Sequence, residues 1–237
     1  MQEPAIPQSN ILLVRLVVFI LRVLLKVYFR LECVGCERVR EVLQLDRPVI
    51  AAMNHASALD PVVVGVCGGV RFVSRFRVPG KRELFDNRLT GWLMRALGMF
   101  PVDRDILDLS VVRTMFRILR AGWGIGIAPE GTRSLTGEVQ PFKSGFIKLA
   151  LKTGAPILPV GIQGAYEAMP KGALIPRPKK VIVRFGKLID LQSYIAGQPV
   201  VPADEELAEM IRQEVIRLSG DADHRRGERA RLNSTGP

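Results

Sequence analysis

The sequence predicts an α/β protein in which helices flank a mixed central sheet, preceded by an N-terminal amphipathic helix that associates with a membrane. Short apolar, β-rich runs alternate with helical patterns from residue 49 to residue 186. Hydrophobic residues make up 48% of the 237 residues, enough for a sizeable core. The segment 11–30 combines aliphatic residues with four regularly spaced cations.

The N-terminal segment ILLVRLVVFILRVLLKVYFR, residues 11–30, predicts one helix with a basic face. Arg22, Lys26 and Arg30 follow Arg15 by 7, 11 and 15 residues, so at about 100° per residue all four cations share one narrow sector. This pattern is typical of a helix in a membrane interface, with its cations toward lipid headgroups. Two alternatives stay open, a membrane-spanning helix in which Arg22 costs roughly 3 kcal/mol and a helix packed against protein.

The expected strands are 49–53, 70–74, 99–102, 124–128, 156–162 and 180–186, and the expected helices are 61–67, 88–97, 108–121, 144–153 and about 203–218. The internal proline of ILPVGI, residues 157–162, indicates an edge strand or a bulge. We therefore expect a membrane-associated helix over 1–30, one enzyme domain over 31–219 and a disordered polar tail over 220–237.

The net charge of +11 and the pI near 10.1 favour acidic partners. Nucleic acid, an anionic membrane, a phosphorylated substrate and an acidic carrier protein all fit, and charge alone does not choose among them. Cys33, Cys36 and Cys67 do not suggest a disulfide framework and fit a reducing compartment. The CVGC segment, residues 33–36, lacks a second cysteine pair or a nearby histidine, which argues against a zinc site.

The segment NHASALD, residues 54–60, follows directly on an apolar strand and contains one of the chain's two histidines. Asp60-Pro61 is a helix-start signal, with Asp60 as the expected N-cap. The loop between them allows Asp60 to accept from the Nδ1–H of His55, which leaves Nε2 as a base. The alternative is a capping aspartate beside an incidental histidine. Because no good nucleophile accompanies the pair, its proton donor is expected to be a substrate hydroxyl, as in acyl or group transfer.

The segment APEGTRS, residues 128–134, directly follows the strand GIGIA. Gly131 allows a close backbone approach and Arg133 offers a forked donor, so the segment suits an oxyanion or a phosphate. A simple turn with an ion pair is the alternative. Lys143 precedes the helix expected from Ser144, a position where a cation is unfavourable unless an anion binds.

These segments together carry a family resemblance. NHASALD resembles the HxxxxD motif of the glycerolipid acyltransferase family, whose best-known bacterial members are 1-acylglycerol-3-phosphate acyltransferases. GMFPVDRD (98–105), APEGTRS and ILPVGI resemble the remaining blocks in the same order, with Ala128 in place of the common phenylalanine. KRELF (81–85) is similar to a lysine-containing segment between the first two blocks. The resemblance covers roughly residues 30–190, and four ordered blocks are far more specific than a lone HxxxxD.

The resemblance implies transfer of a fatty acyl group from acyl-CoA or acyl-carrier protein to the hydroxyl of 1-acylglycerol-3-phosphate, which gives phosphatidic acid. It implies that His55 deprotonates the hydroxyl and that Asp60 orients His55. By similarity, the acceptor site comprises Lys81, Arg104, Glu130, Gly131, Thr132 and Arg133, with Arg133 on the phosphate. No metal, redox cofactor or nucleic-acid partner is implied, and the expected location is the cytoplasmic face of a membrane, peripheral, monotopic or single-span.

Three alternatives to that reaction remain open at this point. The acceptor can be another lysolipid, such as a lyso-ornithine lipid or a lysophospholipid, bound by the same blocks. The His–Asp pair can instead activate water on an ester or thioester, which makes the protein a hydrolase. The blocks can also serve a non-catalytic, lipid-binding module.

Overall fold

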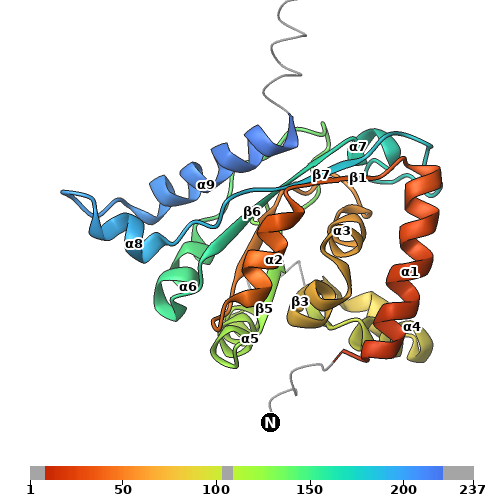
Figure 1. Ribbon diagram of the computed structural model, residues 1–237, viewed down its shortest axis with the longest axis horizontal. Coiled ribbons are helices and arrows are strands. Elements are labelled where there is room, and N and C mark those ends of the chain that lie inside the picture. The colour runs from red at the N-terminus through yellow and green to blue at the C-terminus, as the bar shows by residue number, and fades with distance from the viewer. Residues whose placement is uncertain (1–8, 103–108, 221–237) are drawn as a thin grey trace, which may run out of the picture.

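The computed structural model describes residues 9–102 and 109–220. Within them a seven-stranded sheet has the order β1-β7-β6-β2-β5-β3-β4 (Figure 1). β6, β2, β5, β3 and β4 are parallel to one another, whereas β7 is antiparallel to β6 and β1 is parallel to β7. The strands are β1 (Glu32–Val34), β2 (Ile50–Met53), β3 (Phe76–Lys81), β4 (Met99–Val102), β5 (Gly124–Ile127), β6 (Ile157–Gln163) and β7 (Ile182–Phe185).

Helices cover both faces of the sheet, as the mixed α/β class requires. They are α1 (Ile11–Tyr28), α2 (Cys36–Gln44), α3 (Asp60–Arg75), α4 (Arg88–Ala96), α5 (Leu109–Arg120), α6 (Gly145–Thr153), α7 (Ala165–Ala168), α8 (Leu191–Ala196) and α9 (Asp204–Ser219), with a 3₁₀ turn η1 at Arg82–Phe85. Alternation along β2 builds two cores. Ala51 and Met53 pack toward α2, α3 and α7, while Ile50 and Ala52 pack toward α5, α6, α8 and α9.

The predicted mixed sheet flanked by helices is confirmed, and most predicted elements lie within two residues of the observed ones. The membrane association of the N-terminal helix stays a prediction. The strand predicted at 70–74 is wrong, because these residues continue α3 beyond a kink at Gly69, whose φ is +80°. Phe72 on this helical turn stacks on Phe76 at 4.1 Å between ring centroids, so tertiary packing outweighs the β propensity of the run. The strand that follows β2 in the chain is therefore β3, which begins at Phe76.

Of the two alternatives predicted for 157–162, the edge strand is wrong, whereas a bulge agrees with the irregular pairing beside Pro159. β6 lies inside the sheet, between β2 and β7. Pro159 pairs with Ala52 of β2, and its carbonyl accepts from the N–H of Gly186. On the side of β7, regular pairing begins at Val160 and a further bridge joins Ile157 to Ile189, so Pro159, which has no N–H, lies in the irregular stretch between them.

Cys33 of β1 and Cys67 of α3 form a disulfide, with Cα atoms 5.6 Å apart and a sequence separation of 34 residues. The expectation that the cysteines are unpaired is wrong for these two, and only Cys36 is free. β1 pairs with β7 near the face that α3 covers, which brings the two thiols together. The pairing depends on tertiary structure that cysteine spacing does not reveal.

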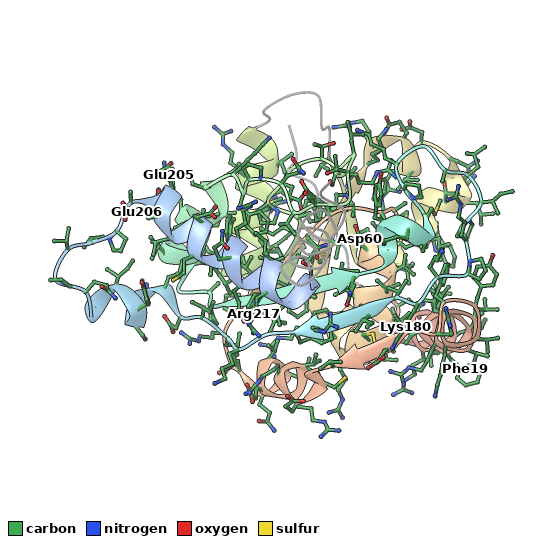
Figure 2. All side chains as sticks on the ribbon, turned by 90° about the horizontal axis from the view of Figure 1, so that it is seen from above. Phe19, Asp60, Lys180, Glu205, Glu206 and Arg217 are labelled. Atoms are coloured by element: carbon green, nitrogen blue, oxygen red, sulfur yellow. A yellow bond between two sulfur atoms is a disulfide. The ribbon has the colours of Figure 1, made fainter. Side chains whose placement is uncertain are left out.

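α1 packs along α3 through a buried stripe that includes Val14, Val18 and Leu25. The opposite face of α1 is aliphatic and exposed, and Figure 2 shows Phe19 on the outer side of the helix. Arg15, Arg22 and Lys26 lie between these two faces, and Arg22 donates from Nη2 to the carbonyl of Val66 at 3.3 Å. The prediction that Arg30 shares this helix is wrong, because α1 ends at Tyr28 and Arg30 has a φ of +49°. Over residues 9–102 and 109–220, no helix has the length and apolarity needed to cross a bilayer.

The predicted boundaries after residues 30 and 219 stay predictions. α9 ends at Ser219 with Gly220 as its C-cap, and the rest of the predicted tail, 221–237, lies outside the described residues.

Candidate active site

His55 and Asp60 meet where β2 ends and α3 begins. Nδ1 of His55 lies 2.9 Å from Oδ2 of Asp60. Asp60 is fully buried, whereas the imidazole is 11% exposed. The carboxylate accepts the Nδ1–H, which fixes the tautomer and leaves the Nε2 lone pair for a substrate proton. The loop geometry expected from the spacing of NHASALD is therefore present.

Asp60 is the first residue of α3 rather than its N-cap, which is Leu59. Its Oδ2 turns back from the helix and also accepts the backbone N–H groups of Ala56 and Ser57, both at 2.8 Å. Burial raises the pKa of Asp60, while the hydrogen bond from His55 acts in the opposite direction. Oδ1 has no hydrogen-bond partner among the described residues. The carboxylate thus holds both the ring of His55 and the loop beside it.

Glu130 holds the backbone of His55. Its Oε1 accepts the N–H of His55 at 2.7 Å, and its Oε2 accepts the N–H of Gln140 at 3.2 Å. The next contact comes from Ser134, whose N–H donates to the carbonyl of His55 at 2.7 Å. The peptide groups on both sides of the His55 Cα are therefore fixed by the loop that follows β5. Burial raises the pKa of Glu130 from 4.5 to about 7.

Asn54 fixes the same loop to β6. Its Nδ2 donates to the carbonyl of Ile162 at 3.0 Å, and its Oδ1 accepts the N–H of Ile162 at 2.8 Å. The parallel ladder between β2 and β6 ends at Met53 and Val160, so the Asn54 carboxamide takes over where the main chain leaves the sheet. Asn54 is 3% exposed, and both ends of its amide are satisfied.

Gly131, Thr132 and Arg133 stand on the solvent side of this loop. Gly131 has a φ of +78°, and a Cβ there would lie 3.0 Å from Nζ of Lys143. Position 131 therefore requires glycine for two reasons: the backbone is left-handed there, and a side chain would collide with that of Lys143. Among the described residues, neither Arg133 nor Lys143 has an ion-pair partner. Ser144, the predicted cap, donates instead to Glu205.

Lys81 ends β3, at the same edge of the sheet as His55, because the carboxyl ends of parallel strands meet at one edge. Its ammonium pairs with Glu83 at 3.0 Å in an exposed position. Arg104 follows β4, but residues 103–108 lie outside the described residues. In the described part of the chain, no three His, Cys, Asp or Glu side chains gather closely enough to hold a metal ion.

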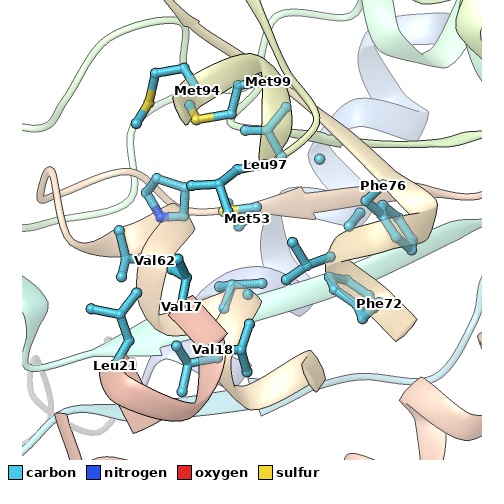
Figure 3. Close-up of a pocket in the computed structure, with 18 of the residues that line it drawn as sticks. Val17, Val18, Leu21, Met53, Val62, Phe72, Phe76, Met94, Leu97 and Met99 are labelled. Carbon is cyan, nitrogen blue, oxygen red and sulfur yellow. The ribbon is translucent and has the colours of Figure 1, made fainter. Parts of the chain in front are cut away.

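An apolar cavity of about 280 Å³ opens beside the His55 loop (Figure 3). Ala58 and Pro61 bring the loop itself into the wall, and Gly126 and Met53 contribute from the sheet. The far walls come from α1, η1 and α4, through apolar residues such as Leu21, Leu84, Met94 and Leu97. Periodicity alone did not identify this cavity, because its lining comes from several separate stretches of the chain between Val17 and Gly126.

Sequence reasoning assigned no role to Asn54, Ser134 or Gln140, although each fixes the His55 loop or the loop that holds it. Their positions inside the quoted blocks or a few residues beyond were the only available signal. The hydroxyl of Ser57 already donates a hydrogen bond to the carbonyl of Met169 at 2.7 Å. It therefore does not serve as a nucleophile in this arrangement.

Known proteins are similar to this chain in both sequence and fold. The family model described as Acyltransferase matches residues 30–163. A Bacillus subtilis 1-acyl-sn-glycerol-3-phosphate acyltransferase is 30% identical over 165 residues, which cover 70% of this chain and 73% of that protein. The protein of that name from Borreliella burgdorferi is 28% identical over 171 residues, 71% of this chain and 65% of its own.

A solved structure extends the similarity to three dimensions. The crystal structure of the 1-acyl-sn-glycerophosphate acyltransferase PlsC from Thermotoga maritima matches with a TM-score of 0.68 and 26% identity, covering 87% of this chain and 79% of that chain. The family match includes β2, β5 and β6 and therefore the whole His55 loop with the segments that hold it. On this combination of sequence, fold and site, the chain belongs to the acyltransferase family.

Proposed function

We propose that this protein transfers a fatty acyl group from an acyl thioester, acyl-CoA or acyl-carrier protein, to the free hydroxyl of 1-acylglycerol-3-phosphate. The product is phosphatidic acid. Family membership and the names of the relatives support this acceptor. The reaction needs no metal or redox cofactor, because the thioester already carries an activated acyl group.

The observation that carries the proposal is the His55–Asp60 pair at the mouth of an apolar cavity. Nε2 of His55 takes the proton from the acceptor hydroxyl as its oxygen attacks the thioester carbonyl. Collapse of the tetrahedral intermediate breaks the carbon–sulfur bond, and the imidazolium returns the proton to the departing thiolate. Asp60 stabilises the charged imidazole between these two steps.

The cavity lined by Met53, Val62 and Met99 suits one acyl chain. Each methylene that leaves water there contributes about 0.8 kcal/mol. Ala58 and Pro61 belong both to the cavity wall and to the His55 loop, so a chain lying in the cavity has its carboxyl end near the base. The methionines in the wall adapt to chains of somewhat different shape.

The acceptor phosphate is proposed to bind at Arg133 and Lys143. The absence of a side chain at Gly131 lets the Lys143 ammonium lie against the loop, and Arg133, two residues further along the chain, offers two parallel donors. Lys81, at the end of β3, and Arg104, which follows β4 in the sequence, are further candidates. Both oxygens of Glu130 are already used by backbone N–H groups, so this residue acts on the acceptor site through the position of His55.

We further propose that α1 holds the enzyme on a membrane. The exposed face of α1 carries Leu12, Leu16, Phe19, Ile20, Val23, Leu24 and Val27, a larger run of exposed apolar side chains than a solvated helix retains. Arg15 and Lys26 of α1 and Arg30 just beyond its end are exposed and match anionic headgroups. The cytoplasmic leaflet is the proposed site, since anionic lipids give it a negative surface potential.

A labelled-donor assay with the purified protein tests the proposed reaction. Radiolabelled acyl donor is supplied with lysophosphatidic acid, with another lysolipid or with no acceptor. Label in phosphatidic acid supports the proposal, and label in free fatty acid points to a hydrolase. Label in another lysolipid product changes the acceptor, and no transfer at all points to a binding module. His55→Ala is expected to lower transfer by about 10²–10⁴-fold, and a variant that keeps more than about a tenth of the rate contradicts the general-base role.

A further inference from the structure

An exposed apolar tip projects from the loop between α7 and β7. The loop spans residues 170–180, PKGALIPRPKK, and contains four cations and no acidic residue. Leu174 is 92% exposed and Ile175 is 80% exposed, higher values than for any other large hydrophobic residue of the described chain. A soluble protein gains nothing from presenting two large aliphatic side chains to water at a basic loop tip.

The loop is ordered by its own backbone. The N–H of Arg177 donates to the carbonyl of Ala168 at 2.7 Å, which closes the loop at its base, and the N–H of Ala173 donates to the carbonyl of Pro170. The tip is therefore held out from the surface by hydrogen bonds below it. A closed loop that presents an apolar tip is built to contact something apolar.

The tip lies next to α1. The hydroxyl of Tyr28, the last residue of α1, donates to the carbonyl of Pro176 at 2.9 Å. Figure 1 shows the loop, in teal, passing from α7 to the C-terminal end of α1. Val27 and Tyr28 are 78% and 45% exposed, so exposed apolar side chains of α1 continue to the end of the helix that the loop contacts.

The positive charge of the loop indicates that the surface around its tip binds an anionic partner. Lys171, Arg177 and Lys179 surround the tip and are exposed. Among the ion pairs of the described residues, the loop takes part through Lys180, which pairs with Glu32 at 2.6 Å. An apolar tip ringed by cations fits the boundary between headgroups and acyl chains of an anionic bilayer, where both parts of the loop are satisfied.

The loop is also joined to the catalytic segment. Its preceding residue, Met169, accepts the hydroxyl of Ser57, two residues after His55. This hydrogen bond thus joins the loop that carries His55 to the base of the loop that carries the apolar tip.

From these contacts we propose that Leu174 and Ile175 form a second lipid-inserting element, which acts beside α1 and keeps the His55 opening at the bilayer surface. This inference rests on the proposed function, because it takes a membrane lipid as the acceptor. It assigns to the loop a part of the membrane contact that α1 does not supply.

Vesicle binding of the full-length protein tests the loop directly. Leu174→Glu/Ile175→Glu is compared with the matched control Val200→Glu/Val201→Glu, which changes another exposed aliphatic pair, 77% and 68% exposed, in the loop before α9. With phosphatidylglycerol vesicles the first variant is expected to lose about tenfold or more in affinity, because two apolar side chains no longer insert. The control is expected to bind as the wild type does. Equal binding by both variants overturns the inference.

Two further measurements separate the possible failures. Ile175→Trp is expected to be quenched by doxyl-labelled lipid, whereas Val200→Trp is not, and the absence of quenching at position 175 overturns the inference even if the glutamate variant misfolds. Transfer to a dispersed short-chain acceptor should be unchanged in Leu174→Glu/Ile175→Glu, while transfer to vesicle-borne acceptor falls. A wild type without transfer to either acceptor overturns the proposed function instead, since the vesicle-binding comparison does not depend on catalysis.

Discussion

The backbone N–H of His55 donates to Oε1 of Glu130 at 2.7 Å, across 75 residues of sequence. This contact gives the glutamate of APEGTRS a structural reason for its place beside the histidine. The acidic side chain is buried, with 6% exposure, and both of its oxygens face backbone donors. Its role in this structure is to set where the catalytic base stands.

We expect Glu130→Gln to lower kcat with little change in KM for the acceptor. The amide oxygen still accepts one backbone N–H, but the amide nitrogen faces the other N–H as a second donor, and hydrogen bonds to a charged group contribute about 1.5–3 kcal/mol. Steady-state kinetics measure the two constants. A rise in acceptor KM at constant kcat contradicts the positioning role and supports direct contact with the acceptor.

The same variant is expected to change how stability depends on pH. Burial raises the pKa of Glu130 from 4.5 to about 7, so the folded protein keeps a proton that the unfolded chain releases between these values. The stability from this group is complete below pH 4.5 and is lost as the pH rises to about 7. The loss is on the order of 3 kcal/mol. Urea unfolding across this window should show a smaller decline in Glu130→Gln than in the wild type, and parallel curves contradict the expectation.

Asn54→Leu is expected to reduce both stability and kcat. Removing the carboxamide leaves the buried N–H and C=O of Ile162 without partners, and each costs about 1–3 kcal/mol. Gln163→Leu is the matched control, because Gln163 is an amide on the same strand that accepts from Arg184 instead of holding the His55 loop. Denaturant unfolding and kinetics are measured for both variants. If the control loses as much kcat as Asn54→Leu, the loss has no specific link to the His55 loop.

Arg133→Ala is expected to lower kcat/KM for lysophosphatidic acid by roughly tenfold to a hundredfold, the effect of losing a charge-assisted contact. The effect on monoacylglycerol, which lacks a phosphate, should be small. Arg217→Ala serves as the surface control, since Arg217 pairs with Glu214 on the outer side of α9. Equal losses with phosphorylated and neutral acceptors contradict the phosphate assignment.

Gly126→Val is expected to shift donor preference toward shorter acyl chains. A Cβ at Gly126 lies 3.3 Å from Cγ2 of Val78 and 3.7 Å from Cε of Met53, both in the cavity wall. The added methyl groups therefore occupy part of the space proposed for the chain. A series of donors of increasing length is compared between variant and wild type, with the shortest donor as the internal control. An unchanged length profile argues against this cavity as the acyl site.

The sequence predicted the parts of the fold and site that depend on local pattern. Strand alternation, helix periodicity and the spacing of His55 and Asp60 are local, and each corresponds to an observed element or contact. The contacts that hold His55 from other segments are not local. Asn54 bonds to Ile162, which is 108 residues away in the sequence. Ser134 bonds to His55 from the loop after β5, the strand that lies next to β2 in the sheet. No single-sequence pattern encodes such pairs.

The wrong strand at 70–74 and the wrong edge assignment of ILPVGI share one physical cause. Both rested on intrinsic preferences, the β propensity of Val and Phe and the missing donor of proline. In the folded chain, stacking of Phe72 on Phe76 and the end of the β6–β7 ladder at Val160 decide the outcome. Propensity is a weak guide wherever neighbouring elements supply or remove the need for a hydrogen bond.

The Cys33–Cys67 disulfide makes residues 33–67 a closed covalent ring, and β2, His55 and Asp60 all lie inside it. For a ring of this size the restriction of the unfolded chain is equivalent to about 4 kcal/mol. A single proteolytic cut within the ring leaves both new ends joined through sulfur, so the catalytic pair stays on one covalent molecule. After reduction, a cut between His55 and Asp60 leaves the two residues on separable fragments.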